Sequence, residues 1–145
     1  MALENVELFG GPTTKAQTPR MSARALKVVK FASGSALLPV GTPVVYDTSA
    51  NTWKPYVQAG ANETNVIRAF LYERPLQLSG TGEQLGVVLI RGEVYAPDVN
   101  TAATRAVMGG SPSAANVDTA LRTNNAAGPT LRELGIDIRG LTQVR

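Results

Sequence analysis

The sequence contains neither cysteine nor histidine in any of its 145 positions. Without cysteine there are no disulfide bonds or thiolate metal ligands, and without histidine there is no imidazole ligand and no His-activated nucleophile. An enzyme of this composition would have to use Asp, Glu, Lys, Arg or Tyr side chains. We therefore predict a protein that is not an enzyme, with no catalytic residues, no metal site and no cofactor.

Long hydrophobic runs are also missing. The first residues, MALENVELFGG, have no basic start followed by an apolar run, so they do not match a signal sequence. No later segment has the uninterrupted apolar length that spans a bilayer. We expect a cytoplasmic product that makes no membrane contact.

The excess of positive charge is confined to the front of the chain. The net charge is +3, and residues 1–30 carry five cations against two anions, whereas the remainder carries nine of each. The dense Lys and Arg blocks that are typical of phosphate-binding domains are missing. We therefore expect no direct binding to nucleic acid.

Residues 1–24 predict an extended N-terminal arm, because neither a helical nor a strand period is maintained around Gly10, Gly11, Pro12 and Pro19. One interpretation is a tail without a role, since chain ends are often unordered. The sharper interpretation is an arm that becomes ordered on a partner through three apolar anchors and three cations that meet acidic groups. These predicted binding residues are Val6, Leu8, Phe9, Lys15, Arg20 and Arg24.

Residues 25–145 predict a single domain that is mainly β. Six of the eight aromatic residues lie between Tyr46 and Tyr95, among short β-branched runs separated by Gly, Pro, Asn and Ser. Lys27 and Lys30 favour a position near a sheet edge for the first strand. Strands are expected at residues 25–31, 44–47, 52–57, 66–72, 85–96 and 136–139.

Two details of the strand at residues 85–96 carry further predictions. Residues 85–90 are nearly all apolar, which is typical of a strand covered on both faces. Gly92 then interrupts the run and indicates a bulge or a close approach of another backbone segment.

Short helices are expected in the C-terminal half. Asn100 is the predicted N-cap of a helix at residues 100–108, and Asn116 is the predicted N-cap of a helix at residues 116–122. Residues 128–135 have an early proline and a glycine at the end, which favours one or two further helical turns. The role of residues 102–127 is left open.

Tyr46, Trp53 and Tyr56 are expected in the core or at a subunit interface, where aromatic residues on strands usually lie. Together with Lys54, they could instead form a stacking platform for single-stranded nucleic acid. This second interpretation gives an alternative function, an oligonucleotide-binding β-barrel module.

The carboxylates offer a third hypothesis, a hydrolase in which two of them act as acid and base. The candidates are Asp47, Glu73, Glu83, Glu93 and Asp98. Each candidate lies beside a turn or a basic residue, as Glu93 lies near Arg91. Solvated or ion-paired roles therefore account for these carboxylates without catalysis.

Several segments, taken in their order, resemble one known family. The segment LPVGTPVVYD at residues 38–47 is followed by WKPY at 53–56, GVV at 86–88 and RGEV at 91–94. Leu131, Leu134, Gly135 and Ile136 then lead into a last strand. This order is similar to that of the small head-decoration proteins of tailed bacteriophages, also called capsid-stabilising or cement proteins, of the lambda-like trimeric kind. The resemblance covers residues 37–145.

The resemblance implies a small β-barrel or β-tulip-like domain that assembles as a homotrimer. The implied partner is the major capsid protein on the outer surface of an expanded capsid, to which the N-terminal arm would attach. Such a protein is located in the virion, after assembly in the host cytoplasm, and stabilises the shell against the pressure of packaged DNA.

Overall fold

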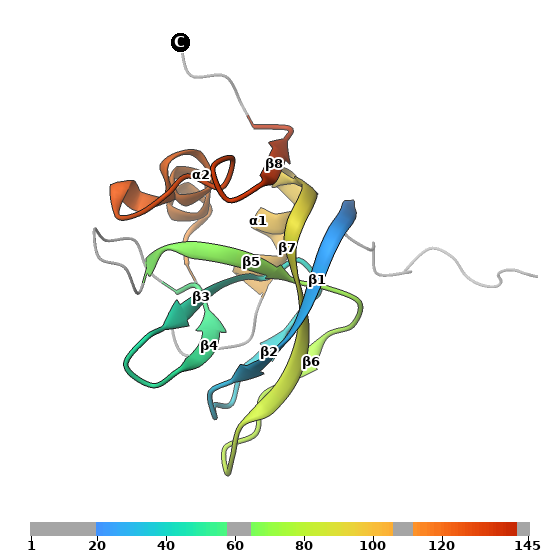
Figure 1. Ribbon diagram of the computed structural model, residues 1–145, viewed down its shortest axis with the longest axis vertical. Coiled ribbons are helices and arrows are strands. Elements are labelled where there is room, and N and C mark those ends of the chain that lie inside the picture. Colours follow the sequence, from blue (N-terminus) through green and yellow to red (C-terminus); the bar gives the residue numbers. More distant parts are fainter. Residues whose placement is uncertain (1–19, 58–64, 106–111, 142–145) are drawn as a thin grey trace, which may run out of the picture.

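The computed structural model describes residues 20–57, 65–105 and 112–141, which form a mainly β fold with short helices in the C-terminal half (Figure 1). The predicted fold class is therefore confirmed. The strands are β1 Met21–Phe31, β2 Leu37–Leu38, β3 Pro43–Asp47, β4 Thr52–Pro55, β5 Ile67–Leu71, β6 Leu76–Gln77, β7 Gln84–Tyr95 and β8 Ile136–Arg139. The helices are α1 Ala96–Arg105 and α2 Ala114–Thr123, followed by a 3-10 turn at Asn124–Ala126.

Five strands close into a barrel in the order β1-β4-β3-β5-β7, and β7 pairs again with β1. The antiparallel pairing of β1 with β7 is long and runs from Met21 opposite Val94 to Phe31 opposite Gln84. In contrast, the parallel junction of β1 with β4 contains the single pair Phe31 and Trp53. The barrel is therefore closed along the whole of one side of β1 and at one point on its other side.

The remaining elements gather at the two ends of this barrel. β8 lies parallel to the last part of β7, with Gly92 opposite Ile136 and Tyr95 opposite Arg139. Figure 1 shows β8, α1 and α2 together at one end and the turn between β6 and β7 at the other. One end of the barrel is thus covered by helices.

Gly92 allows the two longest strands to approach each other. Its φ is +146°, and an added Cβ would lie 2.1 Å from the carbonyl oxygen of Ser22. The register of β1 against β7 shifts opposite this position, between Ala23 and Ala25. The predicted irregularity at Gly92 is confirmed, and it lets β1 bend around the barrel.

The buried side chains form two clusters. The first joins the helices to the barrel and the second fills the barrel interior beside β1 and β2. The first includes Ile67, Phe70, Leu89, Val99, Ala103, Val117 and Leu121, and the second includes Val29, Phe31, Leu38, Val44, Leu71 and Val88. Of the segment 102–127, whose role was left open, the described residues form the end of α1 and the whole of α2, which contribute to the helical cover of the first cluster.

A buried asparagine fixes α2 and the following turn to the barrel. The Ile67 N–H donates to Asn124 Oδ1 at 2.7 Å, and Asn124 Nδ2 donates to the carbonyl oxygens of Ile67 at 2.9 Å and Pro129 at 2.8 Å. Asn124 has φ +50°, and its backbone N–H caps the end of α2 at the Ala120 carbonyl. One side chain thus satisfies three buried backbone groups.

Three predicted boundaries need correction. β1 begins at Met21, so the boundary predicted between residues 24 and 25 falls inside a strand. α1 begins at Ala96 and not at Asn100, because Pro97 fits the first helical turn, where no N–H is required. The N-cap of α2 is Ser113, whose hydroxyl accepts a hydrogen bond from the N–H of Asn116, the residue predicted as the cap.

Two further expectations are also wrong. The helix predicted at residues 128–135 is a series of turns, closed by reciprocal hydrogen bonds between Thr130 and Glu133 and ended by Gly135 at φ +89°. β7 is covered on both faces only in its middle, because Leu89 is fully buried whereas Leu85 is 69% exposed. Apolar character alone did not distinguish these two positions.

Candidate functional site

The residues predicted to attach the arm fall into two groups. Val6, Leu8, Phe9 and Lys15 lie outside the described residues. Arg20 and Arg24 are described, and both contact the body of their own chain. Arg24 lies on β1, and its guanidinium donates to the carbonyl oxygen of Gly135 at 3.3 Å.

Arg20 is held at the end of the barrel that carries α1. Its Nε lies 2.9 Å from Asp98 Oδ2, and its guanidinium carbon lies 3.6 Å from the centre of the Tyr95 ring. The Arg20 backbone N–H donates to the same carboxylate oxygen at 2.9 Å. The hydrogen bond with Arg20 lowers the pKa of Asp98, and reciprocally the pKa of Arg20 is raised. These contacts fix the point at which residues 1–19 join the body.

The three singled-out aromatic residues separate into a surface pair and a core residue. Tyr46 and Trp53 are half-buried partners across β3 and β4, with ring centroids 5.4 Å apart and planes inclined at 54°. Tyr56 is 1% exposed and belongs to the core beneath the helices, where burial raises the pKa of its phenol. Its hydroxyl lies 3.4 Å from the carbonyl oxygen of Asn116.

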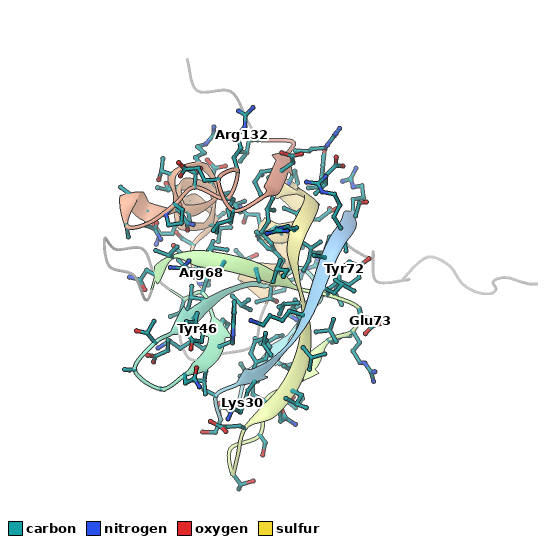
Figure 2. The ribbon with its side chains drawn as sticks, in the orientation of Figure 1. Lys30, Tyr46, Arg68, Tyr72, Glu73 and Arg132 are labelled. Atoms are coloured by element: carbon teal, nitrogen blue, oxygen red, sulfur yellow. The ribbon has the colours of Figure 1, made fainter. Side chains whose placement is uncertain are left out.

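The surface pair lines an open groove of about 480 Å³ between β1 and the strands β3, β4 and β5. The groove is lined by Lys27, Val28, Val29, Lys30, Tyr46, Asn51, Trp53 and Arg68. Figure 2 shows the labelled members Lys30, Tyr46 and Arg68 on the same side of the barrel, opposite Tyr72 and Glu73. We call this feature the β1 groove. Arg68 was not predicted as a site residue, because only the closure of the barrel brings it near the lysines.

An apolar surface lies on the other side of β1, where that strand pairs with β7. Val28 is 62% exposed and Leu85 is 69% exposed. Both line a depression whose other lining residues are Leu71, Arg74, Pro75, Leu76, Gly86 and Val87. Val28 lies directly opposite Val87. Leu26, two residues before Val28 on β1, is 46% exposed. Adjacent exposed apolar residues of this kind are typical of interaction surfaces, and we call this feature the β1–β7 apolar surface.

The carboxylates are arranged for ion pairs with nearby cations. The paired groups lie between 2.9 and 3.4 Å apart and are Arg20 with Asp98, Lys30 with Glu83, Lys54 with Asp47, and Arg139 with Glu93. Glu93 lies on β7, and Glu83 directly precedes that strand. Ten positions of extended chain span about 30 Å, which is too far for an acid and base pair. In the part of the chain that the structure describes, no cluster of three potential metal ligands occurs.

Two comparisons with known proteins were made at the level of sequence. A scan against protein-family models found no family for this sequence, and a search of curated proteins found no relative. Among residues 20–57, 65–105 and 112–141, no helix is both long enough and apolar enough to cross a membrane.

Proposed function

We propose that this chain is a structural protein of a bacteriophage capsid, which binds the outer surface of the expanded shell as a homotrimer and stabilises it. Support comes from the order of sequence segments that resembles the head-decoration proteins, and from the closed β-barrel with its helical cover. Its partner in this role is the major capsid protein. The role requires binding and no chemistry.

The observation that carries the proposal is the β1–β7 apolar surface. Val28 and Leu85 together expose more apolar area than an isolated surface residue, and Pro75, Leu76 and Val87 extend the area around them. Burial of such area stabilises by about 25 cal/mol per Å². A contact between subunits would remove this area from water, and a trimer supplies that contact for each chain.

Residues 1–19 supply the proposed attachment to the shell. Arg20, the residue that follows them, is anchored by Asp98 and Tyr95. An extended segment of this length reaches about 65 Å at most. Three such segments on one trimer raise the effective concentration of each contact, so that weak single contacts give strong attachment.

The first test measures the oligomeric state by size-exclusion chromatography with light scattering. Wild type is expected at three times the chain mass, and Leu85→Asp is expected as a folded monomer. Leu37→Asp is the control, because Leu37 is also an exposed leucine, at 43%, but does not line the depression beside β7. A wild-type monomer at micromolar concentration would refute the trimer.

The second test measures cosedimentation with expanded capsids. Deletion of residues 1–19 leaves Arg20 and the whole of β1 in place. We expect this variant to remain a trimer and to lose binding to the shells. Equal binding of the truncated and full-length proteins would show that the attachment lies elsewhere.

The alternative of an oligonucleotide-binding module has weaker geometric support. Of its four predicted platform residues, Tyr56 is buried in the core and Lys54 is paired with Asp47 at 3.3 Å. The two remaining rings, Tyr46 and Trp53, lean against each other at 54°. Binding of single-stranded DNA that falls steeply with salt concentration would favour this alternative.

A further inference from the structure

The edge of β1 that faces the β1 groove is open over most of its length. Every register partner of β1 from Met21 to Lys30 lies on β7, and among the described residues β4 reaches β1 only at Phe31. A strand paired on one side leaves alternate backbone N–H and C=O groups without a ladder partner on the other. β1 therefore presents an unused hydrogen-bonding edge beside the groove.

The groove follows this backbone edge. Four consecutive residues of β1, from Lys27 to Lys30, line it. Successive side chains of a strand point to opposite faces, and Val29 is in fact directed into the core at 4% exposure. The side chains of consecutive residues cannot all line one face, so the lining includes the main chain of β1. The space beside this edge is open to an extended peptide.

The opposite wall of the groove supplies a side-chain platform. Trp53 and Tyr46 come from the paired strands β4 and β3, and the Tyr46 hydroxyl is hydrogen-bonded to Asn51 in the turn that joins them. Arg68 reaches the groove from β5. This wall can contact the side chains of a bound strand while β1 pairs with its backbone.

The charge of the groove selects the kind of strand that fits. Lys27, Lys30 and Arg68 all line it, and its lining includes no carboxylate from the part of the chain that the structure describes. Lys30 has an ion pair with Glu83 at 3.4 Å, but both side chains are about half exposed, and such pairs contribute little. A second copy of β1 would bring its own lysines against these, which disfavours pairing between identical edges. An acidic strand would instead be complementary.

We infer that the β1 groove binds an extended acidic peptide segment of a partner protein, which adds as a strand to the open edge of β1. The main-chain hydrogen bonds supply affinity, and the cations of the groove select acidic residues at alternate positions of the peptide. The groove shares Val28 with the β1–β7 apolar surface, but the inference does not rest on the proposed trimer or on the proposed shell attachment through residues 1–19.

The test uses full-length protein and a short, end-blocked peptide of alternating threonine and glutamate. Trp53 is the only tryptophan of the chain, so its fluorescence reports on the groove directly. We expect saturable binding, and slower amide hydrogen exchange in β1 when the peptide is present. The double substitution Lys27→Glu and Lys30→Glu should weaken binding about tenfold or more. Arg132→Glu, an exposed cation drawn far from the groove in Figure 2, should leave it unchanged.

A second peptide separates strand addition from simple charge attraction. It has the same sequence, with alternate backbone nitrogens methylated on the edge that would face β1, so it keeps its charge but cannot donate to that strand. We expect this peptide to lose binding. Equal affinity for both peptides would overturn strand addition. Displacement of the first peptide by oligothymidylate at lower concentration would overturn the peptide assignment and identify a nucleic-acid groove.

Discussion

The helix-covered end of the barrel and the two flanks of β1 differ in how completely the rest of the chain covers their apolar side chains and pairs their backbone groups. At the covered end, the buried side chain of Asn124 satisfies three backbone groups, and Val117 and Leu121 cover the apolar residues of the barrel. Beside β1, Val28 and Leu85 remain exposed and a strand edge has no ladder partner among the described residues. The difference supports our two proposals, in which the first region stabilises the fold and the second contacts other molecules.

The largest effect is expected from two matched substitutions on β7. Leu89→Asp places a charge at a fully buried position, which should cost more than about 4 kcal/mol and prevent folding. Leu85→Asp places the same charge on the same strand at a position that is 69% exposed. That variant should remain folded as a monomer and lose only the part of the stability that subunit contacts supply. Circular dichroism during urea unfolding measures both.

This comparison fails if the two variants unfold at the same urea concentration. A soluble Leu89→Asp protein with unchanged stability would show that the interior of the barrel is not where the contacts place it. A Leu85→Asp protein that does not fold would show that the β1–β7 apolar surface contributes to stability within the single chain.

A second pair of substitutions tests the close approach of β1 and β7 at Gly92. Gly92→Ala would bring a Cβ to 2.1 Å from the Ser22 carbonyl oxygen at a φ of +146°, and we expect a loss of about 3 kcal/mol. Gly82→Ala is the control, because no atom lies within 4 Å of the added Cβ. It should change stability by less than about 0.5 kcal/mol. Similar melting temperatures for the two variants would contradict the tight approach at Gly92.

Asn124→Ala tests the covered end alone. It removes the three side-chain hydrogen bonds to Ile67 and Pro129 and leaves their buried backbone groups unpaired, so we expect a loss of about 2 kcal/mol. Asn124→Gly tolerates the positive φ and should isolate the contribution of these hydrogen bonds. Peptide binding in the β1 groove should be unaffected at temperatures where the variant is folded. A coupled loss of binding would show that the two regions are not independent.

The local parts of the fold could be predicted from the sequence, and its long-range parts could not. The strand at residues 136–139 and the irregularity at Gly92 follow from alternation and from the special backbone of glycine. The start of α1 was missed because Ala96 and Pro97 follow a strand without a visible break. The pairing of β1 with β7 joins residues some sixty positions apart, and nothing in either segment specifies the partner.

The same limit applies to the two surfaces beside β1. Lys27 and Lys30 correctly indicated a sheet edge, but Arg68 joins them only through the order of strands in the barrel. The exposure of Leu85 was missed because periodicity shows that a residue is apolar and not whether its own chain covers it. In a single sequence, an exposed apolar residue such as Leu85 cannot be distinguished from a buried one.

The smallest expected effect is a change in stability at low pH. It compares Asp98, at the covered end, with Asp47, beside the β1 groove. A hydrogen bond from Arg20 lowers the pKa of Asp98, and one from Ser49, followed by one from Lys54, lowers the pKa of Asp47 to about 2. A folded-state pKa below the unfolded value of about 3.9 means that the ionised form stabilises the fold. This contribution is complete above about pH 4 and is lost as the pH falls toward the folded pKa.

Asp98→Asn and Asp47→Asn should therefore each lower the melting temperature slightly at neutral pH, and the difference from wild type should shrink as the pH falls from about 4 to about 2. Both effects should be small because Arg20 and Lys54 are substantially exposed to solvent. Asp98→Asn should also loosen the anchored start of the chain, measured as faster proteolysis near Arg20. Asp47→Asn serves as the control for that cleavage, since its partners lie in the turn after β3. A difference from wild type that stays constant from neutral pH to about pH 2 would show that the ionised carboxylates do not stabilise either region.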